Sequence, residues 1–183
     1  MPNGTPPSCV PPGASALERM IEVEVSWGPW AGARDLPSAE AIRRLCELAA
    51  ASAGIGDGHL AIELVDEDHI AEINRRHRGR PGPTDVLSFP VDGEGESPGP
   101  RELGDVIVCP PRAPSALEAI LHGVLHLCGM DHETDEGEML CVQGELLRWE
   151  AAGRREAAGR REAAGRWEAA PGRPAATVRS SAD

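Results

Sequence analysis

The residues around which this chain is organised are the stretch HGVLHLCGMDH, residues 122–132, which contains three of its six histidines. His122 and His126 are four residues apart, so on a helix both side chains project from one face, about one turn apart. Gly129 can adopt a left-handed conformation and end that helix. The chain then turns back, and His132 can approach the same point. Three neutral imidazoles with an open fourth position are the ligand set of a catalytic Zn²⁺ site.

Two other interpretations of the histidine cluster remain open. One of the histidines could be a buried core residue, or the metal could be purely structural. A closed structural zinc site usually includes cysteine, and the only cysteine nearby, Cys128, lies on a different side of the helix from His126. The spacing therefore favours a catalytic metal site held by His122, His126 and His132.

The same histidine spacing occurs in zinc proteases that carry the motif H-E-x-x-H-x-x-G-x-x-H. In those enzymes the glutamate of the motif serves as the general base. Here Gly123 occupies that position, and glycine cannot take a proton from water. Peptide hydrolysis is therefore disfavoured, and a metalloprotease is the weakest of the functional hypotheses.

Length and composition limit the class of protein further. A chain of 183 residues is long enough for one domain with a substantial core. The net charge of −12 argues against general affinity for nucleic acid, so no DNA partner is expected. Five scattered cysteines suggest reduced thiols in a cytoplasm. No run of apolar residues is long enough to span a membrane, so no membrane partner is expected.

Hydrophobic periodicity predicts four strands and four helices. The strands are expected at residues 20–27, 59–65, 84–89 and 104–109. One helix begins at Ser38, a second lies between Asp66 and Gly79, a third carries His122 and His126, and a last one follows a cap at Asp135 and Glu138. The predicted fold class is α+β, with a small mixed four-stranded sheet, helices packed on it, and the metal-binding helix followed by a C-terminal helix.

The start of the metal-binding helix has its own signature. Ser115 and Glu118 form the pattern of a capping box. The side of this helix opposite the histidines is apolar and is expected to pack against the sheet, which would hold the metal ligands rigid; its residues are Leu117, Ile120 or Leu121, Val124 and Cys128. Asp131, beside the third histidine, is expected to orient one of the imidazole rings.

Composition divides the chain into three parts. Residues 1–18 are rich in Pro, Gly and Ser and are predicted to be a disordered extension. Residues 19–149 carry the predicted elements and form the expected catalytic domain. Residues 150–183 begin with the repeated unit EAAGRR and are predicted to be a low-complexity tail, since a glycine every sixth residue weakens a helix by about 1 kcal/mol each time.

The stretch RRHRGR, residues 75–80, is the one strongly basic cluster. It can be a solvated helix end, in which arginines complement the negative end of the helix dipole. It can also be the basic wall of a local cleft. Charge alone favours the first interpretation.

Three blocks of sequence make the chain resemble the YbeY family of bacterial endoribonucleases. The first combines Ile73-Asn74, Arg78-Gly79 and the segment PTDVLSFP at 83–90. The second is LGDVIVCP at 103–110, and the third is the histidine motif with Met139 and Glu145 after it. The resemblance covers about residues 20 to 148. It implies cleavage of single-stranded RNA in rRNA maturation, at the 3′ end of 16S rRNA, and in ribosome quality control in the cytoplasm, with the small ribosomal subunit as partner.

The resemblance also implies roles for particular residues. One Zn²⁺ ion is expected on His122, His126 and His132, and the catalytic residues are expected to be Arg78 and the metal-bound His122. Such an ion polarises a phosphate oxygen and lowers the pKa of bound water to about 7, while Arg78 clamps the phosphate. The general base is unassigned. The alternative function is a non-enzymatic ribosome-assembly factor with a structural zinc.

One departure from the family concerns the connection before the metal-binding helix. Relatives resembling this chain have a longer segment there, which includes a helix. In this chain only residues 110–121 bridge the gap.

Overall fold

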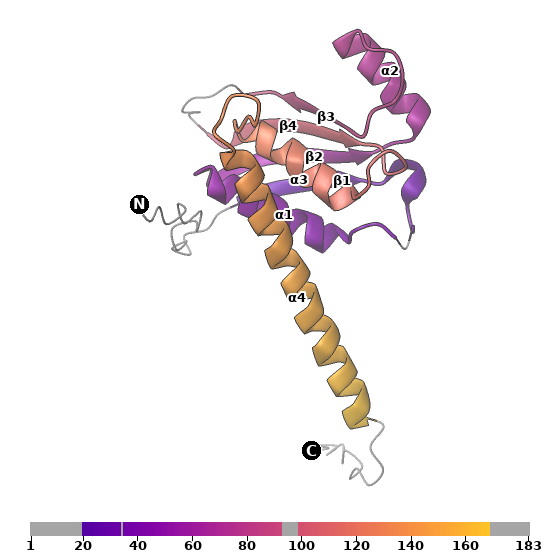
Figure 1. Ribbon diagram of the computed structural model, residues 1–183, viewed down its shortest axis with the longest axis vertical. Coiled ribbons are helices and arrows are strands. Elements are labelled where there is room, and N and C mark those ends of the chain that lie inside the picture. Colours follow the sequence, from indigo (N-terminus) through magenta and orange to yellow (C-terminus); the bar gives the residue numbers. More distant parts are fainter. Residues whose placement is uncertain (1–19, 34, 93–98, 169–183) are drawn as a thin grey trace, which may run out of the picture. The chain divides into compact units, whose positions relative to one another are not determined.

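The computed structural model describes residues 20–33, 35–92 and 99–168 (Figure 1). Its elements are β1 (Met20–Ser26), the 3-10 helix η1 (Gly28–Trp30), α1 (Ala39–Ser52), β2 (Asp57–Leu64), α2 (Glu67–Arg78), β3 (Val86–Pro90), β4 (Arg101–Val108), α3 (Ala116–Leu127) and α4 (Glu138–Glu168). The chain divides into two compact units after Leu147. The extension predicted for residues 1–18 lies outside the described residues.

The four strands form one mixed sheet in the order β1-β2-β4-β3. β1 runs parallel to β2, and β2 runs parallel to β4. β3 is antiparallel to β4 and lies at the edge of the sheet. The predicted α+β class with a mixed four-stranded sheet is confirmed.

β4 begins three residues before the predicted start at Gly104. Arg101 and Glu102 pair with Gly58 and His59 of β2, and the register then shifts. Leu103 and Gly104 are both buried at this irregularity, which breaks the alternation on which the prediction depended. Gly104 has a φ of 120°, and a Cβ atom there would overlap the carbonyl of Phe89.

The main core lies between the sheet and the helices α1 and α3. Ser38 starts α1 with a side chain that accepts a hydrogen bond from the Ala41 N–H at 3.2 Å. Figure 1 shows α3 lying across the sheet, and α3 also contacts α1. The fully buried residues of this core include Ile42 and Leu45 of α1, Leu60, Ile62 and Leu64 of β2, and Ile120, Val124 and Leu125 of α3. The predicted apolar side of the metal-binding helix is therefore buried as expected.

α2 packs on a second, smaller cluster, in which Ile70 meets Leu87 and Ile107. The helix begins where Asp66 accepts a hydrogen bond from the His69 N–H at 2.9 Å, and it ends at Gly79 in the left-handed conformation. The buried Asn74 donates a hydrogen bond to the Gly82 carbonyl at 3.0 Å. These contacts hold the basic end of α2 beside the start of β3.

α4 continues well past residue 149, where its amphipathic pattern ends, and runs to Glu168. Ion pairs four residues apart support the repeat, with Arg154 Nε 3.5 Å from Glu150 and Arg160 Nη1 3.7 Å from Glu156. Such Glu-to-Arg pairs and alanine favour a helix, against the cost of the repeated glycines. The helix therefore extends into the segment predicted to be a low-complexity tail, as far as Glu168. None of the helices in the described ranges is long and apolar enough to cross a membrane.

Candidate metal centre

α3 carries the first two histidines and ends where the sequence predicts. Ser115 caps the helix by accepting a hydrogen bond from the Glu118 N–H at 3.3 Å. Gly129 has a φ of 87°, and the Met130 N–H donates to the Leu125 carbonyl at 3.0 Å. This hydrogen-bonded turn closes the helix and reverses the chain. It directs the following residues back towards the histidine-bearing face.

Gly123 lies where α3 comes closest to the sheet. A Cβ atom at this position would lie 2.6 Å from Cγ1 of Val106 on β4 and 3.2 Å from Oγ of Ser88 on β3. Both distances are shorter than ordinary van der Waals contact. The position that holds the general base in the zinc proteases is therefore packed against strands in this protein and has no room for a side chain.

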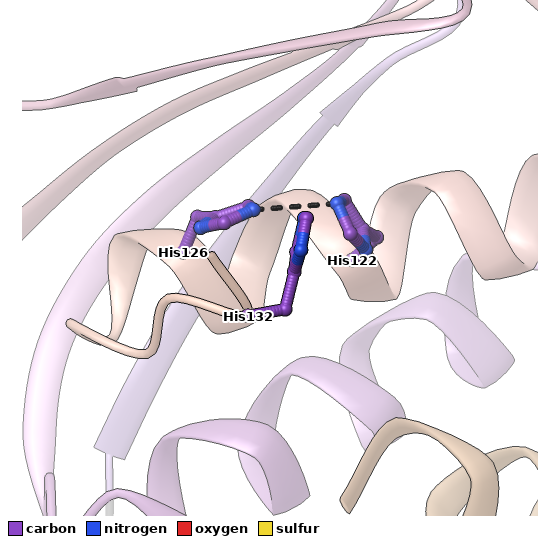
Figure 2. A group of neighbouring side chains, drawn as sticks. All are labelled: His122, His126 and His132. Carbon is purple, nitrogen blue, oxygen red and sulfur yellow. Dashed lines mark hydrogen bonds between the residues drawn. The ribbon is translucent and has the colours of Figure 1, made fainter. Parts of the chain in front are cut away.

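The three imidazoles meet on the exposed side of α3. Figure 2 shows the rings of His122, His126 and His132 pointing towards one another, the first two from α3 and the third from the loop that follows. One ring nitrogen of each lies within 4.8 Å of the others, and Nε2 of His122 is 3.3 Å from Nε2 of His126. All three residues are half-buried. The structure therefore brings the three predicted ligands together, in a group that could hold a metal ion.

The tautomer of His126 shows that its inner nitrogen suits a metal. Its Nδ1 lies 3.0 Å from the Met130 carbonyl oxygen. A carbonyl only accepts, so Nδ1 carries the proton and Nε2 keeps a free lone pair directed into the cluster. Burial, followed by the nearby His122, lowers the pKa of His126 below 6.5. The neutral, ligating form therefore predominates at pH 7.

Cys128 is the only cysteine within two residues of these ligands, and it lies outside the candidate metal-binding group. Burial raises its pKa to about 12, whereas the thiolate is the form that binds metals. The donor set is therefore three imidazoles without a thiolate, which suits Zn²⁺ with an open coordination position.

Two aspartates stabilise the loop that carries His132 by accepting hydrogen bonds from backbone N–H groups. Asp131 accepts a hydrogen bond from the Glu133 N–H at 3.0 Å, so its carboxylate is used within its own turn. Asp135 accepts from the Met139 N–H at 2.8 Å and from the Gly137 N–H at 2.7 Å. The Met139 bond is the main cause of the lowered pKa of Asp135. Asp135 thus binds N–H groups at the start of α4, as the predicted cap requires, but the helix begins at Glu138 and not directly after the aspartate. Its carboxylate links the His132 loop to the start of α4.

A residue that sequence reasoning missed contacts the outer nitrogen of His122. Oε1 of Gln143 lies 3.0 Å from Nδ1 of His122, and its amide nitrogen lies 3.3 Å from the Glu118 carboxylate. The outer ring nitrogens of His122 and His126 thus contact Gln143 and the Met130 carbonyl. Asp131, which was expected to orient one of the rings, instead accepts from the Glu133 N–H. A signal was present in the sequence, because Gln143 lies four residues after the buried Met139 on the apolar side of α4.

A groove with a volume of about 1060 Å³ runs past the three histidines. Its other lining residues include Arg78 and Arg80 at and after the end of α2, Thr84, Asp85 and Ser88 around β3, Ser115 and Glu118 at the start of α3, Met130, Asp131 and Glu133 in the loop after α3, and Gln143 of α4. The structure therefore brings the predicted residue Arg78 to the same groove as the histidine cluster.

The basic cluster divides into two pairs with different environments. Arg75 and Arg76 both bind Glu72 of their own helix, at 2.8 and 3.0 Å. Arg78 and Arg80 line the groove, and within the described part of the chain neither has an ion-pair partner. Arg75 and Arg76 therefore lie on a solvated helix end, whereas Arg78 and Arg80 lie in the wall of the groove, where a role in binding phosphate stays a prediction.

Comparison with known proteins gives consistent matches. A family model described as Endoribonuclease YbeY matches residues 35–148. Endoribonuclease YbeY of Bacillus cytotoxicus is 43% identical over 128 residues, which covers 58% of this chain and 82% of that protein. Endoribonuclease YbeY of Persephonella marina is 38% identical over 122 residues, covering 58% and 77%. A solution structure from Thermotoga maritima matches 75% of this chain and 93% of that one, at 27% identity and a TM-score of 0.45.

Proposed function

Because this chain belongs to the endoribonuclease YbeY family, we propose that it is a zinc-dependent endoribonuclease that hydrolyses phosphodiester bonds of single-stranded RNA. Its place of action is rRNA maturation, at the 3′ end of 16S rRNA, and ribosome quality control in the cytoplasm, with the small ribosomal subunit as partner. One observation carries the proposal: a three-histidine group and two arginines, which have no ion-pair partner among the described residues, line the same groove.

The donor set defines the part that each residue plays. His122, His126 and His132 would hold the ion, and as neutral ligands they leave its double charge uncancelled. When bound, Zn²⁺ polarises a phosphate oxygen and lowers the pKa of coordinated water. The planar guanidinium of Arg78 can donate two parallel hydrogen bonds to a phosphate. It thereby positions the scissile group and stabilises the negative charge that develops on its oxygens.

The charge distribution limits where RNA can bind. A net charge of −12 repels the phosphate backbone over most of the molecule. Within the groove, Arg78 and Arg80 supply local positive charge, and the carboxylates of Asp85, Glu118, Asp131 and Glu133 line other parts of it. Binding is therefore expected to depend on this groove, and to weaken as salt rises because each phosphate contact releases counterions.

Chelation of the metal is expected to abolish RNA cleavage. The purified protein should cleave an unstructured RNA, lose this activity after dialysis against a chelator, and recover it when Zn²⁺ is returned. His126→Ala should remove both metal and activity, because one of three ligands is lost. His69→Ala is the matched control, since His69 is an exposed histidine on α2 outside the cluster.

The same experiment distinguishes an endoribonuclease from the alternative function. In the alternative, the ion only ties α3 to the loop after it, and the protein is a non-enzymatic ribosome-assembly factor. Folded, zinc-loaded protein without any RNA cleavage would support that alternative. Undiminished metal in His126→Ala would contradict the metal centre itself.

Zinc binding is expected to fail in acid. The pKa of His126 lies below 6.5 in the metal-free chain, so its Nε2 is free at pH 7, and protons compete for it only as the pH falls. Dialysed protein should retain one Zn²⁺ per chain at pH 7.5 and lose it progressively below about pH 6, as imidazoles protonate. Elemental analysis after dialysis at several pH values measures this loss. Full retention at pH 5 would contradict it.

A further inference from the structure

Gln143 is a buried amide that connects α4 to two residues of α3. Its side chain is on the inward side of α4, and the residue is only 8% exposed. Its oxygen lies 3.0 Å from Nδ1 of His122, and its nitrogen lies 3.3 Å from the carboxylate of Glu118. A buried amide is costly unless both of its polar atoms are satisfied. Both polar atoms of Gln143 have partners, the oxygen with the ring of His122 and the nitrogen with the carboxylate of Glu118.

The carboxylate of Glu118 determines which way this amide faces. An ionised carboxylate accepts hydrogen bonds and has none to donate, so the NH₂ group of Gln143 must face Glu118. The amide oxygen then faces Nδ1 of His122. An amide oxygen also only accepts, so Nδ1 must carry the proton of the neutral ring. The lone pair of His122 is therefore on Nε2, which faces Nε2 of His126 at 3.3 Å. With this assignment the contact joins two acceptors, as ligands of one metal ion would be, and not a donor and an acceptor.

We propose that Gln143, oriented by Glu118, is the positioning residue that keeps His122 in its metal-binding tautomer. The role rests on the metal centre of the proposed function and adds a specific determinant of its affinity. The first turns of α4 then support the metal centre as well as packing on the core. Asp135 ties the start of α4 to the His132 loop through the Met139 N–H, and Met139 is fully buried. Hydrogen bonds thus link the N-terminal end of α4 to His122 and to the loop that carries His132.

The test is the affinity for Zn²⁺, measured by competition with a chelator. Gln143→Met has similar volume and keeps the packing, but it removes both hydrogen bonds. We expect its zinc affinity to fall between tenfold and a hundredfold, the usual loss when a ligand's outer partner is removed. Val142→Ala, at the half-buried neighbouring position, is the control. It should lower the unfolding temperature and leave zinc affinity unchanged.

Exchanging the two side chains provides a second, more specific test. Gln143→Glu alone places two carboxylates against each other and should weaken zinc binding. Adding Glu118→Gln restores a donor opposite the new carboxylate, which still accepts from Nδ1 of His122. The double variant should therefore recover most of the affinity lost in the single variant. No recovery would mean that the pair acts only through packing, and the positioning role would be rejected.

The tautomer itself can be observed in the metal-free chain by ¹⁵N NMR of the histidine rings. Wild-type His122 should be protonated on Nδ1, and Gln143→Met should show a mixture of both tautomers. If wild type binds no zinc, the proposed function fails, while the tautomer measurement still tests Gln143. If wild type binds zinc and Gln143→Met binds it equally well with an unchanged tautomer, only the inference about Gln143 is wrong.

Discussion

Arg78→Lys is expected to fold and bind zinc normally, while RNA cleavage falls a hundredfold or more. Lysine keeps the positive charge but loses the planar fork that binds a phosphate through two hydrogen bonds. Loss of one contact to charge that develops in the transition state costs about 3 kcal/mol. Arg78 is exposed at the end of α2 and lines the groove, so the substitution should leave the core and the histidine cluster intact.

Single-turnover cleavage of a short single-stranded RNA at two salt concentrations measures this effect. Arg75→Ala and Arg76→Ala are the matched controls, because both arginines bind Glu72 on the same helix. They should weaken RNA binding only modestly, mainly through salt-dependent attraction. Equal, salt-sensitive losses in all three variants would show that Arg78 belongs to a diffuse basic patch, and its catalytic role would be withdrawn.

Gly123→Glu is expected to unfold the domain, although it completes the sequence motif of a zinc protease. The Cβ atom alone would lie 2.6 Å from Val106 Cγ1, and the carboxylate would be buried at a fully packed helix–sheet contact. Overpacking a core typically costs about 1–3 kcal/mol, and an unpaired buried charge adds to that cost. A loss of 3 kcal/mol or more is a large part of the roughly 5–15 kcal/mol that stabilises a domain.

Urea unfolding and a peptide-hydrolysis assay on the same preparation test this expectation. Gly159→Glu is the control, because a Cβ atom at Gly159 would meet nothing within 4 Å. This control should be neutral or slightly stabilising, since glutamate favours a helix more than glycine does. A folded Gly123→Glu protein that hydrolyses peptides would contradict both the packing argument and the exclusion of protease activity.

The sequence by itself determined the features that depend on local spacing. The four-residue separation of His122 and His126 follows the helical repeat, and Gly129 ends the helix because it takes a positive φ at low cost. The caps at Ser115 and Asp135 act within four residues of themselves. Alternating apolar residues likewise predicted the four strands, apart from the start of β4. Each of these features is decided by neighbours in the chain, and for that reason each was predictable.

The tertiary structure alone decided the features whose partners are distant in the chain. Gln143 is 21 residues from His122 and 25 from Glu118, so only the docking of α4 on α3 brings the three together. Arg78 differs from Arg75 because α2 packs on β3 and turns one side of its basic end towards the groove. Gly123 is required because two strands lie against it. Backbone periodicity places a side chain on a face of its own element, but what that face meets depends on packing across the whole domain.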